Sequence, residues 1–106
     1  MNKQIILTKG DYGIELQIQF LDDKRQPIDI TGQTVDVCFV SPMFDKKFYQ
    51  PYLIEPKEGK CGIIITEEMT KEEGLYSTYW RVLDEDELVT AQDNLYYFVL
   101  PKFGGV

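Results

Sequence analysis

The sequence lacks histidine altogether, contains only two cysteines, and has no long run of apolar residues. Without histidine there is no Ser-His-Asp or Cys-His catalysis, and the commonest protein ligand of metals is missing. Two isolated cysteines do not form a disulfide framework, so a reducing cytoplasm is the simplest place of synthesis. No apolar stretch approaches the roughly 20 residues that a membrane-spanning helix needs.

Basic residues are scarce as well. Lys and Arg number 11 against 18 Asp and Glu, which gives a net charge of −7. A free-standing nucleic-acid binder releases counterions from phosphate with a positive surface, and this chain is acidic. The composition therefore favours a binding or structural module that contacts neither nucleic acid nor a membrane.

The residues that are present predict one β domain. The 106 residues are 43% hydrophobic, 27% charged and 13% aromatic, which is typical of a globular chain with one core. Apolar residues recur at every second position, the period of a β-strand. The segments with this pattern are residues 4–8, 14–20, 35–39, 48–54, 61–66, 75–83 and 95–100. Short strands between polar turns predict an all-β sandwich or barrel over residues 1–101, with a linker or disordered tail starting at 102–106.

Two segments between the expected strands have the residues of short helical turns. Residues 28–32 allow one turn at most, whereas residues 66–74 start with Thr, carry acidic residues and end with Gly, as capped helices do. In the first segment Asp29, Thr31 and Gly32 form either a docking loop or a structural turn. The residue types favour the structural turn, because Asp and Thr bond the local backbone and Gly supplies a positive φ.

Four consecutive acidic residues, 84–87, lie between the last two expected strands. Carboxylates bind calcium, but neighbours in an extended turn do not converge on one centre, and the EF-hand spacing is absent. The run is better interpreted as a solvated hairpin tip. The glutamates of residues 67–73 similarly favour a solvated helical turn over a pair of glycosidase carboxylates. We therefore assign no catalytic residue, metal ligand or cofactor.

Aromatic residues indicate where a protein partner binds. Tyr76 and Trp80 share one face of an expected strand, and Tyr96 lies on the final one. Tyr and Trp are enriched at interface hot spots, so these residues predict a partner surface, although packing at the sandwich edges explains them as well. Met43 and Phe44 occupy a loop tip, where they either contact a partner or fold back over the core.

Cys38 and Cys61 fall on the third and fifth expected strands. The bridge of antibody domains joins the second and sixth strands instead. We therefore expect two free thiols that are buried or half-buried.

The order of these features resembles the amino-terminal domain of phage baseplate upper proteins. The series runs from Leu-Thr-Lys-Gly-Asp at residues 7–11, through an alternating strand and an acidic turn, to Asp-Ile-Thr-Gly-Gln-Thr-Val at residues 29–35. The second half adds an apolar strand, a turn ending at Gly74, Leu-Tyr-Ser-Thr-Tyr at residues 75–79 and a final strand closing at Leu100. The resemblance spans nearly the whole chain.

The resemblance implies an immunoglobulin-like antiparallel β-sandwich of about seven strands with one or two short helical turns. It also implies a non-enzymatic structural domain of a phage or prophage tail, located in the virion after synthesis in the host bacterial cytoplasm. Such a domain docks a receptor-binding or fibre assembly onto the tail tip, through the distal tail protein and a receptor-binding protein, and can form a homo-oligomer in the particle. The alternative is a carbohydrate-binding β-sandwich module or a receptor-binding tip domain.

Overall fold

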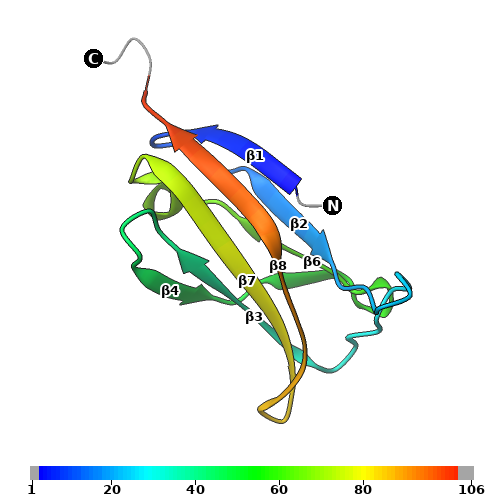
Figure 1. Cartoon of the computed structure of the whole chain (residues 1–106). Helices are drawn as coiled ribbons and strands as arrows, with labels where there is room; N and C mark the ends of the chain where they lie inside the picture. Colours follow the sequence, from blue (N-terminus) through cyan, green and yellow to red (C-terminus); the bar gives the residue numbers. More distant parts are fainter. Residues whose placement is uncertain (1–2, 103–106) are drawn as a thin grey trace.

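A computed structural model describes residues 3–102, including all side chains except those of residues 3, 4 and 92–94. This part of the chain forms eight strands and two short 3-10 helices, which build the two-layer sandwich of Figure 1. In chain order the elements are β1 (Lys3–Thr8), β2 (Glu15–Gln19), β3 (Thr34–Val40), β4 (Lys46–Tyr49), β5 (Tyr52–Glu55), η1 (Pro56–Glu58), β6 (Lys60–Ile64), η2 (Glu67–Thr70), β7 (Gly74–Asp84) and β8 (Glu87–Leu100). Within residues 3–102 there is no helix long and apolar enough to cross a membrane.

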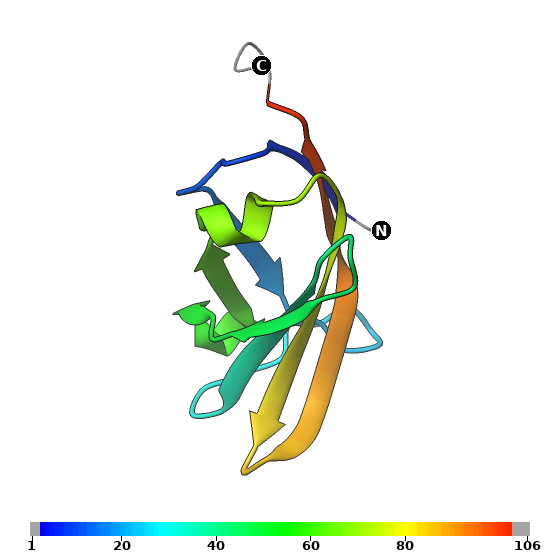
Figure 2. The same ribbon diagram turned by 90° about the vertical axis from the view of Figure 1, so that its left-hand side faces the viewer.

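The two sheets differ in size. One has five strands in the order β1-β8-β7-β3-β4, and the other has three in the order β2-β6-β5. Figure 2 shows the layers side by side, with β2 in blue on one side and the β7–β8 hairpin in yellow and orange on the other. The orders β2-β6-β5 and β3-β7-β8 are those of strands B-E-D and C-F-G in an immunoglobulin sandwich, with β4 added beside β3. The predicted all-β sandwich is confirmed.

Three strands depart from the predicted pattern. The single strand expected over residues 48–54 is two strands in different sheets, because Pro51 cannot donate a ladder hydrogen bond and interrupts the pairing. β8 begins at Glu87, well before the expected start at residue 95. β1 pairs with β8 in parallel along its whole length, so the five-stranded sheet is mixed rather than purely antiparallel.

The expected helical turns have different outcomes. η2 lies inside the segment 66–74, as its capping residues predict. Residues 28–32 contain no helix. The other 3-10 helix, η1, lies directly after β5, where none was expected. Of the tail expected over 102–106, residues 103–106 lie outside the described part of the chain.

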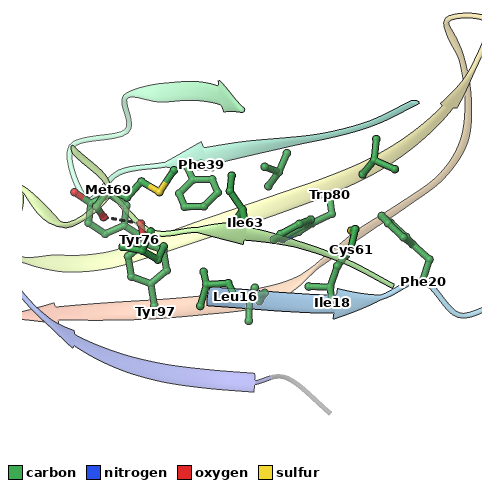
Figure 3. Packing of buried hydrophobic residues seen from close by; sticks show 14 of the residues in the cluster. Leu16, Ile18, Phe20, Phe39, Cys61, Ile63, Met69, Tyr76, Trp80 and Tyr97 are labelled. Atoms are coloured by element: carbon green, nitrogen blue, oxygen red, sulfur yellow. Dashed lines mark hydrogen bonds between the residues drawn. The ribbon is translucent and has the colours of Figure 1, made fainter. Parts of the chain in front are cut away.

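β7 alternates between buried and outward-facing side chains, and a buried hydroxyl satisfies the polar groups on its inner face. Thr78 and Trp80 are 0% and 1% exposed. The Thr78 hydroxyl donates to the carbonyl oxygen of Leu95 on β8 (2.8 Å) and accepts the indole N–H of Trp80 (2.8 Å). Both polar groups are therefore satisfied inside the sandwich, where Trp80 packs near Ile18, Cys61 and other core residues (Figure 3).

Two tyrosine hydroxyls hold the segment between β6 and β7 on the core. The Tyr97 hydroxyl donates to the carbonyl oxygen of Met69 in η2 (2.6 Å), the bond drawn in Figure 3. Tyr76 stacks on Tyr97 with ring centroids 4.7 Å apart, and its hydroxyl oxygen accepts the N–H of Glu72 (3.2 Å). A tyrosine near the start of strand F that bonds the backbone a few residues upstream is a hallmark of immunoglobulin sandwiches.

Cys38 on β3 and Cys61 on β6 are both free and buried. This confirms the expectation of two free thiols, although Cys61 lies on the sixth strand rather than the fifth. Burial raises the pKa of the Cys61 thiol to about 12, so the thiol stays protonated at neutral pH.

Replacing Thr78 with Val removes the hydroxyl that accepts the Trp80 N–H and donates to the Leu95 carbonyl in the core. We expect the free energy of unfolding to fall by about 1 to 3 kcal/mol, because the buried Trp80 N–H is left without its partner. Urea unfolding measures the change. Ser77→Ala, on the opposite face of β7, is the control and is expected to cost less than about 0.5 kcal/mol. An equally small loss for Thr78→Val would contradict the role given to its hydroxyl.

The buried thiol supplies a second test. In a Cys38→Ala variant only Cys61 remains, and at pH 8 its raised pKa keeps the unreactive thiol form while burial blocks the reagent. We expect iodoacetamide to label the denatured variant completely in a time that leaves the folded variant unlabelled. Mass spectrometry measures the added group. Labelling of the folded protein at the denatured rate would show that Cys61 is not in a closed core.

Candidate functional site

The outer face of the five-stranded sheet carries apolar and aromatic side chains where a sandwich normally presents polar residues to water. Because the even-numbered residues from Tyr76 to Val82 point inward, the odd-numbered residues of β7 point outward. The strand register aligns these outward residues in four rows across the sheet. The rows are Ile6–Phe98–Leu75, Tyr96–Ser77–Val40–Lys46, Tyr79–Cys38–Phe48 and Ala91–Arg81–Asp36, and we call this set the outer face.

Several apolar side chains of the outer face are well exposed. Ile6 is 63% exposed, Phe48 61%, Tyr79 43% and Leu75 42%. They come from β1, β4 and β7, so the exposed apolar surface crosses the sheet from one edge strand to the other. Exposed apolar side chains gathered on one face mark an interaction site more often than scattered ones do.

The charged residues of the outer face largely cancel. Arg81 donates two hydrogen bonds to the Asp36 carboxylate, at 2.8 and 2.5 Å, and its guanidinium carbon lies 5.8 Å from the centre of the Phe48 ring. Lys46 is the other charged residue in the four rows. The outer face is thus close to neutral on a chain whose net charge is −7.

The loop between β3 and β4, residues 41–45, presents Met43 and Phe44 beside the outer face. These side chains are 71% and 84% exposed. Ser41 Oγ accepts the N–H groups of Met43 (3.2 Å) and Asp45 (3.1 Å), and the carbonyl oxygen of Ser41 accepts the N–H of Phe44 (2.9 Å). The loop is closed by its own hydrogen bonds, which hold both apolar side chains in solvent instead of over the core.

Phe44 has a strained backbone. Its φ of 66° lies in the left-handed region, which is unfavourable for a bulky residue. The loop is also fixed against β7, because Pro42 packs so closely on Gly74 that a Cβ there would lie 2.9 Å from the proline side chain. A strained, exposed aromatic residue on a fixed loop indicates a preformed contact site.

A shallow groove lies beside this loop. Its lining residues are Phe39, Ser41, Asp45, Lys47, Tyr49, Glu68, Met69, Lys71 and Tyr76. Hydrogen bonds from Lys47 and Lys71 lower the pKa of Glu68 to about 2, and burial raises the pKa of Tyr49. Both shifts move the groups away from neutral pH, which is the reverse of what a general acid or base needs.

The structure separates the residues predicted to bind a partner. Met43 and Phe44 are exposed, and Tyr96 is half-buried on the outer face. Tyr76 and Trp80 are only 3% and 1% exposed and belong to the core, so they cannot form the predicted contact surface. This corrects the prediction for these two residues. The alternation of β7 turns their face inward.

The predicted turn motif lies before β3. Asp29 Oδ1 accepts the N–H of Thr31 (2.9 Å) and its hydroxyl (2.6 Å), and these bonds lower the pKa of Asp29. Gly32 has a φ of 77°, and the N–H of Gln33 donates to the carbonyl oxygen of Ile30 (3.1 Å). The Asp29 and Thr31 side chains therefore bond only within a local turn, which the N–H of Ile30 ties to η1 by donating to the carbonyl oxygen of Pro56 (2.9 Å).

The acidic run 84–87 is the tip of the β7–β8 hairpin, in yellow and orange in Figure 1. Glu85 and Asp86 have φ values of 49° and 71°, as a two-residue hairpin turn with two left-handed residues requires. None of the four carboxylates forms an ion pair with a side chain that the structure describes. Among all the residues that the structure describes, no group of three or more His, Cys, Asp or Glu side chains is placed to hold a metal ion.

Sequence reasoning missed most of the outer face, including Ile6, Phe48, Leu75 and Tyr79. The sequence does carry a signal for this face. Both faces of β7 are rich in apolar or aromatic residues, although only one of them can lie in the core. The largest side chain, Trp80, could have marked the inward face. An indole buries more apolar area than either of the outward side chains, Leu75 or Tyr79, would bury in its place.

Comparisons with known proteins agree with this fold. The structure matches the N-terminal domain of phage TP901-1 ORF48 with a TM-score of 0.72 and 13% sequence identity, over 92% of this chain and 84% of that chain. A comparison with curated protein sequences found no match. The family model of the BppU N-terminal domain matches residues 1–103. Because this match covers nearly all of the 106 residues, the chain belongs to the family of BppU N-terminal domains, the amino-terminal structural domains of phage baseplate upper proteins.

Proposed function

We propose that this domain docks onto a neighbouring tail protein and so attaches a receptor-binding or fibre assembly to the tail tip. The observation that carries the proposal is the fixed loop that presents Met43 and Phe44 to solvent. A preformed apolar knob binds with little loss of conformational freedom, so more of its contact energy appears as affinity. Membership of a baseplate family supports a place in the virion tail.

The proposed partners are the distal tail protein and the receptor-binding protein of the same phage. Tyr96 joins Met43 and Phe44 in the proposed contact, and residues 1–101 act as the docking unit. The role is structural and non-enzymatic, the chain is made in the cytoplasm of the host bacterium, and copies of it can associate within the particle. Contacts with nucleic acid or a membrane have no part in this function.

A carbohydrate-binding module or receptor-binding tip has less support. A sugar ring stacks on an exposed aromatic face, and Trp80, the residue expected to offer one, is buried in the core.

Phe44→Gly separates binding from stability. Glycine adopts a φ of 66° without strain, so we expect the free energy of unfolding to stay the same or rise by up to about 1 kcal/mol. Removing a hot-spot side chain costs about 2 kcal/mol, so affinity for the distal tail protein is expected to fall about 30-fold. Calorimetry measures the unfolding, and size-exclusion co-elution at tens of micromolar followed by titration calorimetry measures the binding.

Leu53→Ala is the control for this variant. Leu53 is 40% exposed on β5 in the three-stranded sheet, away from the loop, and its replacement is expected to leave affinity unchanged. Undiminished binding by Phe44→Gly would contradict the role of the loop. A wild-type domain that fails to co-elute with the distal tail protein would contradict the docking function itself.

A further inference from the structure

We propose that the outer face, together with the loop of residues 41–45, is the surface that docks. Its partner is a protein surface with an apolar centre and a cluster of Lys and Arg that meets the hairpin tip, residues 84–87. This inference rests on the proposed function and adds to it the face that is used and the chemistry of the partner.

The apolar centre follows from the outer face itself. Exposed side chains run from Ile6 on β1 through Leu75 and Tyr79 on β7 to Phe48 on β4. Burying such side chains is favourable, and the ion pair in the neighbouring row, Arg81 with Asp36, is already formed and needs no partner charge. A matching surface is therefore apolar and uncharged where it covers these rows.

The other large sheet surface is a poorer candidate. The outward residues of β2 are Glu15, Gln17 and Gln19, which form a polar strip. β5, at the edge of the same sheet, lies between Pro51 and Pro56, and its pairing with β6 is irregular. Polar side chains and an irregular edge are the features by which natural sheets avoid association.

The partner covers the face instead of extending the sheet at β4. This edge strand begins with Lys46 and Lys47, and edge lysines oppose the addition of another strand. The Lys47 ammonium group already bonds Glu68, which ties the edge to η2.

The basic cluster follows from the hairpin tip. Its four carboxylates make up more than half of the net charge of −7 and have no ion-pair partner among the described side chains. Leu88, opposite Leu83 and 59% exposed, continues the apolar surface toward the tip. From Leu75 to Asp84, β7 is about 30 Å long, within the reach of one protein partner.

A second copy of this chain is a poor occupant. It would bring another net charge of −7 and a second tip of four carboxylates, while the only unpaired cation in the four rows is Lys46. Like charges repel across an interface, whereas a basic partner is attracted from a distance and associates faster.

The test compares two leucine-sized side chains of equal exposure on opposite sheets. Leu75 is 42% exposed on the outer face, and Ile64 is 43% exposed on β6. The distal tail protein of the same phage is the probe, and surface plasmon resonance gives Kd and the association rate. We expect Leu75→Ser to raise Kd at least tenfold and Ile64→Ser to change it less than twofold. Tyr79→Ser provides a second variant of the outer face, and thermal melts verify that each variant is folded.

A charge variant tests the basic cluster without touching the core. Glu85→Gln, Asp86→Asn and Glu87→Gln together are expected to lower the association rate at least threefold at 50 mM salt and to have little effect at 500 mM salt. An association rate that changes neither with the substitutions nor with the salt concentration would rule out the proposed basic cluster on the partner.

The remaining outcomes are distinct. If the wild-type domain binds and Leu75→Ser and Tyr79→Ser bind equally well, the outer face is not used, while the docking function stands. If the wild-type domain does not bind, the docking function fails and this inference fails with it. If analytical ultracentrifugation shows a dimer of the domain that Leu75→Ser dissolves, the occupant is a second copy and the basic partner is overturned.

Discussion

Burial of the Trp80 indole, whose N–H is satisfied by the Thr78 hydroxyl, sets which face of β7 enters the sandwich. The same hydroxyl donates to the carbonyl oxygen of Leu95, which holds β8 against β7. Once these side chains point inward, alternation forces Leu75 and Tyr79 into solvent, and the strands paired on either side add their own outward residues in register. The orientation that buries Trp80 and Thr78 therefore also places the apolar residues of the opposite face in solvent.

Much of the architecture could be predicted from the period of apolar residues, because a strand with one buried face alternates whatever its partners are. The expected strands failed where a single residue interrupts the pairing, as Pro51 does, or where polar residues extend a hairpin, as in the first half of β8. The candidate site was harder. Leu75 and Tyr76 are neighbours with largely apolar side chains, so the alternation alone does not show which of them is buried, and only the size of Trp80, on the same face as Tyr76, marks that face as the inner one. The fate of Phe44 similarly depends on hydrogen bonds to Ser41 that no pattern of residue types reveals.

The molecule divides its surface into parts of different chemistry. The outer face is mostly apolar and close to neutral, and the loop of residues 41–45 adds an exposed Met and Phe on a closed, strained backbone. The hairpin tip holds four carboxylates that form no ion pair with a described side chain. This arrangement suits a domain whose task is to be held in an assembly. Apolar area and a preformed knob give affinity, and the separated charge gives orientation and rate.

Hydroxyl-radical footprinting of the domain, alone and in complex with the distal tail protein, shows which sheet docks, because it reports on the exposure of single side chains. We expect Met43, Phe44, Phe48 and Tyr79 to lose reactivity in the complex. Tyr52 and Leu53, both 40% exposed on the three-stranded sheet, are expected to keep theirs. Protection of Tyr52 and Leu53 with unchanged reactivity at Phe48 and Tyr79 would rule out the outer face and place the docking surface on the opposite sheet.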